Sequence, residues 1–369
     1  MRRLIIPLFV PHLGCPHQCI FCNQQRISGT SDHMMTPDLL EKTVMLHQKT
    51  RGGKRRKNAQ IAFFGGSFTG LETRIQKSLL SKAYDFVRDG TVESIRISTR
   101  PDYIHSDIVQ FLKSYMVRTI ELGVQSMVDS VLMLSNRGHS SFHVKRAVTM
   151  IKDHELEVGL QIMPGLPGDT NEHIMYTVDK IIEMKPDFVR IYPTLVIKDT
   201  PLEQIFLNEE YTPMTLNEAV DVCKEALLKF EDAHIPVARL GLQPTLELDK
   251  EGAVVAGPYH PAFRHLVESS FFFDMAEILI KNTSLYEGRF IFKVNPKDYS
   301  YFCGQKNENL LKLREKYGLK DVMVVPETSV KRRNLELSVG SSLFFYERKM
   351  WGRKEEENGF GNRREGTRH

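Results

Sequence analysis

Short apolar runs that favour β-strands alternate along the chain with longer segments of helical periodicity, and this alternation constrains the fold most. Residues 73–88 place apolar side chains on one stripe and charges opposite, which is typical of an amphipathic helix, and residues 171–184 and 216–232 do the same. Strands and helices recurring at roughly 25–50 residues predict βαβ units around a parallel sheet. The expected strands are residues 4–10, 61–64, 95–97, 119–124, 158–162, 188–192 and 236–242.

This pattern predicts an α/β fold with a core and an extension. Seven strands within about 240 residues favour a (β/α) barrel, partial or complete, over a doubly wound open sheet. The pattern breaks near residue 242, so we expect a barrel core over residues 1–243 and a small α+β C-terminal extension over 244–346. Residues 347–369 have almost nothing to bury, and we expect a disordered tail there.

The bulk composition indicates an ordinary globular chain. Of its 369 residues 41% are hydrophobic and 26% are charged, and the net charge of +4 excludes a polycation. The first apolar run is interrupted by Pro7 and is too short for a signal peptide, and no run approaches the roughly 20 residues that span a bilayer. We therefore expect a cytoplasmic protein without membrane contact, whose thiols stay reduced.

Each expected strand is followed by residues that a plain turn would not need. Because the C-terminal ends of parallel strands share one edge, where ligands bind in such folds, these segments predict one large site. The segments are GCPHQCIFCN at 14–23, GGSFTG at 65–70, STRPD at 98–102, QSM at 125–127, MPGLPGD at 163–169, RIYPT at 190–194 and GLQPT at 241–245.

Three of the five cysteines, Cys15, Cys19 and Cys22, lie within the first of these segments. A disulfide is disfavoured in a reducing compartment, and a redox pair of Cys19 and Cys22 would leave Cys15 unexplained. A zinc site, with His12 or His17 as fourth ligand, and an iron–sulfur cluster fit the spacing equally well, so local chemistry leaves both open.

The spacing Cys-x3-Cys-x-aromatic-Cys, after the first strand of a βα barrel, resembles the radical S-adenosylmethionine (SAM) superfamily, and the resemblance covers about residues 4–245. It implies a [4Fe-4S] cluster on Cys15, Cys19 and Cys22, whose free iron binds SAM and whose electron cleaves it to a 5′-deoxyadenosyl radical. The strand-end segments match the superfamily's order. By that match the residues that contact SAM are Phe21, Gly65, Gly66, Ser67, Ser98, Arg100, Gln125, Ser126, Met163, Pro164 and Gly165.

Within the superfamily, six motifs of this chain resemble the radical SAM domain of the Elongator catalytic subunit, a tRNA wobble-uridine modifying enzyme, and its bacterial stand-alone relatives. These motifs are GCPHQCIFCN, STRPDYI, ELGVQS, NRGH, MPGLPGD and RIYPTLVIKDTPL. This chain departs from Elongator because nothing after residue 260 resembles an acetyltransferase domain. The resemblance implies an electron donor such as flavodoxin or ferredoxin, and it favours an RNA nucleoside, such as one of tRNA, as substrate. The alternatives are a small molecule such as a porphyrin precursor, or a non-catalytic zinc-bearing RNA-binding module.

Some further residues have two interpretations. The basic loop RGGKRRKN, residues 51–58, is either solvated or contacts a polyanion. Tyr192, at a strand end, is either a core tyrosine or a relay for a hydrogen atom or proton. His139 and His260 are acid–base candidates or structural hydrogen-bonders. Cys223 is expected to be buried, whereas Cys303 is expected to be exposed, with a possible redox role.

Overall fold

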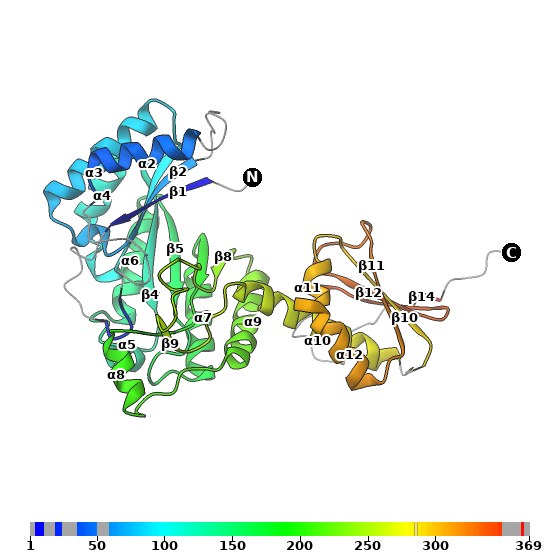
Figure 1. Ribbon diagram of the computed structural model, residues 1–369. Coiled ribbons are helices and arrows are strands. Elements are labelled where there is room, and N and C mark those ends of the chain that lie inside the picture. The colour runs from blue at the N-terminus through cyan, green and yellow to red at the C-terminus, as the bar shows by residue number, and fades with distance from the viewer. Residues whose placement is uncertain are drawn as a thin grey trace. The chain divides into compact units, whose positions relative to one another are not determined.

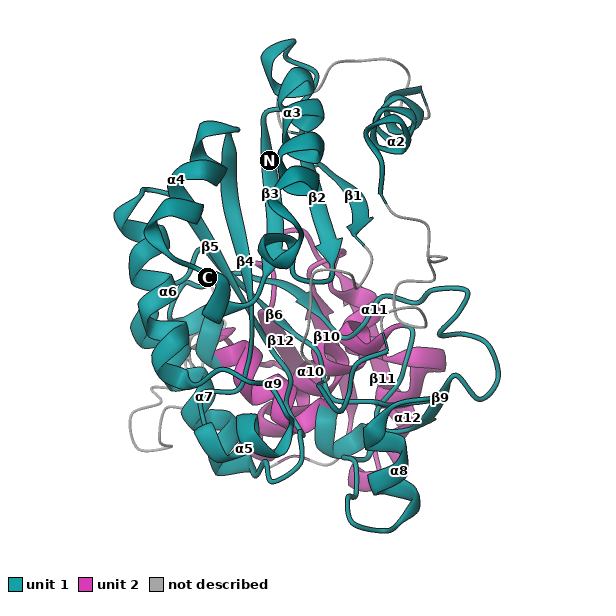
Figure 2. Ribbon diagram, turned by 90° about the vertical axis from the view of Figure 1, so that its left-hand side faces the viewer, with its two compact units in different colours: residues 1–219, 229–261 teal, residues 220–228, 262–369 magenta. Residues whose placement is uncertain are grey.

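The computed structural model describes residues 4–10, 19–23, 35–49, 59–283, 285, 287–348 and 363–364. The chain divides into two compact units (Figure 2). Unit 1 comprises residues 1–219 and 229–261, and unit 2 comprises residues 220–228 and 262–369. The boundaries expected from the sequence, at residues 243 and 346, remain predictions.

Unit 1 is built on a parallel sheet, which has seven strands in the described residues (Figure 1). The strands follow one another in space as they do along the chain, and β1 and β8 form its two ends. The sheet is therefore a partial barrel, and its order lacks the reversal of a doubly wound sheet. The strands are β1 (Leu4–Val10), β2 (Ala59–Gly65), β3 (Ser94–Thr99), β4 (Val117–Gln125), β5 (Glu157–Ile162), β6 (Phe188–Ile191) and β8 (Val237–Leu240).

Of the connecting helices, α2, α3, α4 and α6 contact the strands of the sheet, whereas residues 220–228 of α9 belong to unit 2. Helix α3 buries Leu79, Ala83 and Phe86, as its periodicity predicts. Thr170 caps one helix by accepting from the amide of His173, and a capping box of Thr215 and Glu218 begins another. The helices are α2 (Pro37–Lys49), α3 (Thr73–Arg88), α4 (Ser106–Ser114), α5 (Asp129–Leu134), α6 (Ser141–Asp153), α7 (Asn171–Met184), α8 (Pro201–Leu207) and α9 (Leu216–Asp232), with short 3-10 turns at Phe68–Gly70 and Pro101–Tyr103.

Two details of the sheet bear on the site. Strand β1 pairs with β2 over its whole length although it contains Pro7, opposite Ala62. Strands β4 and β5 shift register between Gly123 and Gln125, where a β-bulge ends β4. Beyond the sheet, β7 (Val196–Ile197) and β9 (Val254–Ala256) form a small antiparallel ribbon.

Unit 2 is an α+β unit with a sheet ordered β11-β10-β12-β13-β14 in its described part. Its strands are β10 (Arg289–Val294), β11 (Asp321–Pro326), β12 (Leu335–Val339), β13 (Ser342–Tyr346) and β14 (Arg363–Arg364), and its helices are α10 (Phe263–Thr283), α11 (Tyr299–Cys303) and α12 (Glu308–Tyr317), with a 3-10 turn at Gln305–Asn307. Strand β14 lies in the segment expected to be disordered, and residues 349–362 and 365–369 of that segment lie outside the described residues.

The two isolated cysteines are both buried. Cys223 has no exposed surface, which confirms its prediction, and burial raises the pKa of its thiol. Cys303 is only 3% exposed, so the prediction of an exposed thiol is wrong. It ends helix α11 in the core of unit 2, beside Phe302, whose ring packs 4.9 Å from that of Phe292. Burial also raises the pKa of Cys303, which makes a reactive thiolate unfavourable.

Candidate active site

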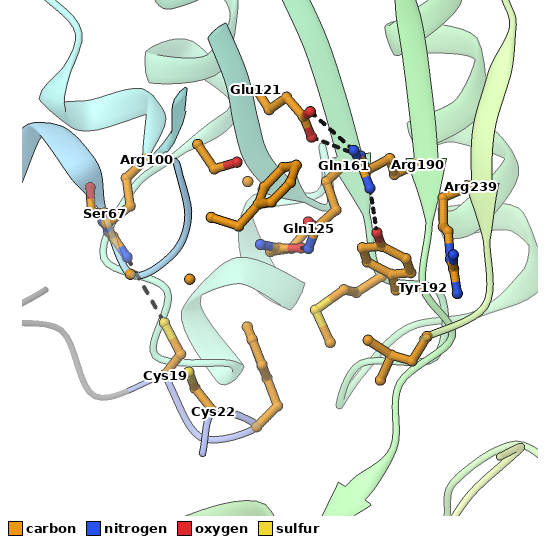
Figure 3. A pocket seen from close by; sticks show the side chains of 18 of the residues that line it. Cys19, Cys22, Ser67, Arg100, Glu121, Gln125, Gln161, Arg190, Tyr192 and Arg239 are labelled. Carbon is orange, nitrogen blue, oxygen red and sulfur yellow. Dashed lines mark hydrogen bonds and ion pairs between the residues drawn. The ribbon is translucent and has the colours of Figure 1, made fainter. Parts of the chain in front are cut away.

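A cavity of about 470 Å³ opens in unit 1 at the C-terminal ends of the strands, the edge expected from the sequence (Figure 3). Of the residues predicted to form the site, its lining includes Cys19, Phe21, Cys22, Gly65, Gly66, Ser67, Ser98, Arg100, Gln125, Met163 and Tyr192. The described lining does not include Ser126, Pro164 or Gly165. Cys15, His12, His17 and the basic loop 51–58 lie outside the described residues.

The segment that carries Cys19 and Cys22 is a tight turn tied to unit 1 by its backbone. The amide of Cys22 donates to the carbonyl of Cys19 at 3.1 Å. The amide of Ile20 donates to the carbonyl of Ser135 at 3.3 Å, and the carbonyl of Ile20 accepts from the amide of Leu202 at 2.9 Å. Cys19 and Phe21 are 4% and 7% exposed and pack in an apolar cluster with Val131, Leu166 and Val196. This turn therefore holds the two thiols at one end of the cavity, with Cys19 buried and Cys22 partly exposed (Figure 3).

Two arginines approach the sulfur of Cys19. Nη1 of Arg137 donates to Sγ at 3.3 Å, and Nη1 of Arg100 lies 3.9 Å from it. Arg100 also pairs with Asp102: its Nε donates to Oδ1 and its Nη2 donates to Oδ2, each at 3.0 Å. The same Nη2 donates to the carbonyl of Arg137. Nη1 is thus the nitrogen of Arg100 that lies nearest the cysteine turn, while Nε and Nη2 bond Asp102 and the carbonyl of Arg137.

Glycine at position 65 allows a close approach of two strands. Its φ is +105°, and a Cβ there would lie 2.5 Å from the carbonyl oxygen of Val10. The next amide, that of Gly66, donates to the same oxygen at 3.1 Å. Nearby, the hydroxyl of Ser67 bonds that of Thr99 at 2.8 Å. The backbone at the end of β2 thus borders the cavity without an intervening side chain.

The β-bulge at the end of β4 presents Gln125 to the cavity. Gln125 has a φ of +69°, which is costly for a residue with a side chain and typical of functional sites. Its carbonyl accepts from the amide of Met163 at 2.9 Å, and its Oε1 accepts from Nε2 of Gln161 at 3.3 Å. The hydroxyl of the next residue, Ser126, instead bonds Thr177 of α7 at 3.3 Å.

The backbone groups of Pro164 and Gly165 form hydrogen bonds within their own loop and with two other segments of unit 1. The carbonyl of Pro164 accepts from the amide of Thr194 at 2.9 Å. The amide of Gly165 donates to Oδ2 of Asp169 at 3.0 Å, and its carbonyl accepts from the hydroxyl of Tyr211 at 2.6 Å. Of residues 163–165, which the resemblance implies contact SAM, Met163 is the residue that reaches the described cavity lining.

A buried ion-pair network in the barrel interior was not predicted from the sequence. Glu121 of β4 forms ion pairs with two arginines. Its Oε1 lies 2.6 Å from Nη1 of Arg96 on β3, and its Oε2 lies 2.7 Å from Nε of Arg190 on β6. Arg190 Nη1 in turn donates to the hydroxyl of Tyr192 at 3.1 Å (Figure 3). The available signal was a charged residue inside each apolar strand, which a buried strand tolerates only when the charge is paired.

The cavity is cationic. Its described lining contains four arginines, Arg100, Arg137, Arg190 and Arg239, against one acidic residue, Glu121. Arg239 Nη1 donates to Oε1 of Gln243 at 3.1 Å at the end where β8 leaves the sheet. Such a lining favours ligands that carry negative charge.

Neither histidine candidate lines this cavity among the described residues. His139 is buried, with its Nε2 3.2 Å from the carbonyl of Val124, and burial beside Arg137 lowers its pKa to about 2. It is therefore neutral and structural at ordinary pH. In the described part of the chain, no helix has both the length and the apolarity that a membrane crossing requires.

Comparisons with known proteins agree with this architecture. A family model described as the radical SAM superfamily matches residues 9–181, and a radical SAM C-terminal domain model matches residues 186–271. The tRNA uridine(34) acetyltransferase of Methanocaldococcus infernus is 29% identical over 260 residues, which cover 60% of this chain and 48% of that protein. Elongator complex protein 3 of Saccharomyces cerevisiae is 33% identical over 137 residues, which cover 36% of this chain and 24% of that protein.

A solved structure extends the likeness to both units. The archaeal Methanocaldococcus infernus Elp3 with an N-terminal deletion aligns with a TM-score of 0.56 at 20% identity, over 94% of this chain and 74% of that one. This likeness shows a shared fold. The chain spans about half the length of the tRNA uridine(34) acetyltransferases that it matches.

Proposed function

Because the chain belongs to the radical SAM superfamily, we propose that it cleaves SAM reductively at a [4Fe-4S] cluster in this cavity. When bound, these cofactors supply a 5′-deoxyadenosyl radical, because one electron from the cluster breaks the sulfonium bond of SAM and releases methionine. The observation that carries the proposal is the approach of Arg137 and Arg100 to the sulfur of Cys19.

The residues at Cys19 suit such a cluster. Arg137 is 7% exposed, and among the described residues its Nε is a buried donor without an acceptor. A buried cation beside a neutral thiol would be costly, whereas thiolates on an iron–sulfur cluster supply the negative charge and the acceptors that it lacks. We propose Cys15, Cys19 and Cys22 as the three cluster ligands.

The chain's own residues bind and orient SAM in this proposal. The backbone of Gly65 and Gly66 gives the methionine end a close approach, and Phe21 forms an apolar wall beside the cysteines. The remaining proposed contacts from the cavity lining are Ser67, Ser98, Arg100, Gln125 and Met163. Ser126, Pro164 and Gly165, outside the described lining, remain proposed contacts from the resemblance alone. Tyr192, whose hydroxyl accepts from Arg190 and which lines the cavity, is proposed as the relay for a hydrogen atom or proton.

Metal analysis after anaerobic reconstitution tests the cluster. We expect about four iron and four sulfide per chain, and loss of both in Cys19→Ala and Cys22→Ala. Cys223→Ala is the matched control, because this thiol is fully buried in a helix and should not affect iron content. A parent protein that holds one zinc ion and no iron would refute the proposed function.

For the substrate class we propose a nucleoside of tRNA, with a one-electron donor of the flavodoxin or ferredoxin type. The relatives named above as tRNA uridine(34) acetyltransferases support a tRNA substrate, and the four arginines of the cavity lining suit a ligand with phosphate groups. The acetyl transfer in those names is not part of the proposal, because the chain spans only about half of their length.

Formation of 5′-deoxyadenosine with dithionite as reductant tests the substrate. Bulk tRNA should stimulate it and should acquire a modified nucleoside detectable by mass spectrometry, whereas ribosomal RNA fragments should do neither. If the basic loop 51–58 holds tRNA by phosphate contacts, neutralising its five cations should also flatten the salt dependence of tRNA binding. Absence of tRNA binding at low salt would point to a small-molecule substrate instead.

A further inference from the structure

The charge of Arg137 is not balanced by any carboxylate in the described part of the chain. Its guanidinium donates to the carbonyl oxygen of Gly123 from Nη2 at 2.6 Å and to Sγ of Cys19 from Nη1 at 3.3 Å, while Nε has no acceptor there. Its neighbour Arg100 differs, because Asp102 pairs with it at 3.0 Å and offsets its charge. The sulfur of Cys19 thus faces one compensated and one uncompensated cation.

The placement of Arg137 is built into the fold. Its amide donates to the carbonyl of Leu132 at 2.9 Å, and its own carbonyl accepts from Arg100, so the backbone is fixed on both sides. A Cβ at Gly123 would lie 2.7 Å from Nη2 of Arg137, so glycine at this position leaves the space that the guanidinium occupies. The arginine therefore reaches Cys19 through a slot between the end of β4 and the cysteine turn.

A buried positive charge that donates to a ligand sulfur stabilises the state of a metal cluster that carries one more electron. Net charge and hydrogen bonds to sulfur are among the factors that set the potential of iron–sulfur clusters. We propose that Arg137 is a positioning residue that raises the reduction potential of the cluster bound through Cys19, so that a one-electron donor can reduce it. This inference rests on the proposed function, since it requires Cys19 to be a cluster ligand.

The test is the midpoint potential of the reconstituted cluster, measured without SAM by an EPR-monitored titration with dithionite. In Arg137→Gln we expect the equilibrium constant for reduction of the cluster to fall at least tenfold. For a one-electron couple, a tenfold fall makes the midpoint potential about 59 mV more negative. Arg137→Lys keeps the positive charge, so its midpoint potential should differ from that of the parent by less than half as much as the potential of Arg137→Gln does. The control is Arg118→Gln, because Arg118 lies on β4, the strand that carries Gly123, but is half exposed and pairs with Glu93.

Gly123→Ala provides a second route if Arg137→Gln does not retain iron. Its added Cβ must displace the guanidinium, so the potential should shift in the same direction with Arg137 still present. Equal potentials in the parent and in the iron-loaded variants would overturn the inference while leaving the proposed function intact. A parent without a cluster would overturn both.

Discussion

Replacing Glu121 by alanine should destabilise unit 1 strongly. The carboxylate is 5% exposed and is the partner of two guanidiniums, those of Arg96 at 2.6 Å and Arg190 at 2.7 Å. After its removal Arg96 would keep Gln60, whose Oε1 accepts at 2.9 Å, and Arg190 would keep Tyr192. Neither of these remaining partners carries a negative charge, so two cations would remain inside the barrel.

The expected size follows from the burial of both pairs. Removing one partner of a buried ion pair typically costs about 3–5 kcal/mol, and Glu121 leaves two cations rather than one. For a unit of this size each kcal/mol lowers Tm by about 2–4 °C, so the shift should be about 6–20 °C. Glu121→Gln keeps an acceptor oxygen but not the charge, so its Tm should lie between those of the parent and the alanine variant.

The measurement is thermal unfolding of the metal-free protein by circular dichroism. Hydrogen exchange of β4 and β6 by mass spectrometry should accompany it, because two compact units do not guarantee a single transition. Glu183→Ala is the matched control, since Glu183 pairs with Lys180 at 2.7 Å on the surface and such pairs contribute about 0–1 kcal/mol. Equal shifts in the Glu121 and Glu183 variants would refute the argument.

Other predictions concern the cavity walls. Burial raises the pKa of Asp169 to about 6, so Asp169 favours folding while protonated, and this contribution is lost as pH rises from about 4 to 6. Asp169→Asn should remove this decline, and its Tm advantage over the parent should grow across pH 4–7; a constant difference would contradict this. Gly65→Ala should retain iron but lose SAM in equilibrium dialysis, because its Cβ meets the Val10 carbonyl at 2.5 Å; Gly90→Ala is the control, since Gly90 also has a positive φ but open space around it. Gln125→Gly should relieve the strain of a positive φ and keep the free energy of unfolding within about 1 kcal/mol of that of the parent, while weakening SAM retention; unchanged retention would show that the side chain makes no contact.

The strands could be predicted because their signal is local. The run expected at residues 236–242 contains β8, Val237–Leu240, and the run at 61–64 lies within β2, Ala59–Gly65. Whether the sheet closes could not be predicted, since a partial and a complete barrel share the same rhythm of strands and helices. Closure depends on whether the first strand pairs with the last, which periodicity does not encode.

Segments that border the cavity could be predicted where glycine, proline and cysteine mark the loops. Contacts between side chains far apart in sequence were missed. Arg137 reads as an ordinary loop residue in NRGH, and its role depends on Cys19, 118 residues away. Glu121 reads as an interruption of an apolar run until Arg96 and Arg190 are placed beside it. Cys303 was assigned to the surface from the glycine that follows it, because nothing local indicates that α10 and β10 cover it.

Pro7 affects the tendency of the protein to self-associate. An open sheet presents an edge strand whose backbone groups can pair with a strand of another chain, which is a common route to aggregation. Strand β1 keeps an unbroken register with β2 through Pro7, and a proline fits such a ladder only where its missing amide hydrogen points away from the partner strand. In the described part of the chain no strand pairs with the outer edge of β1, and this edge lacks a donor at its centre. A strand of another copy would therefore find a poor template there.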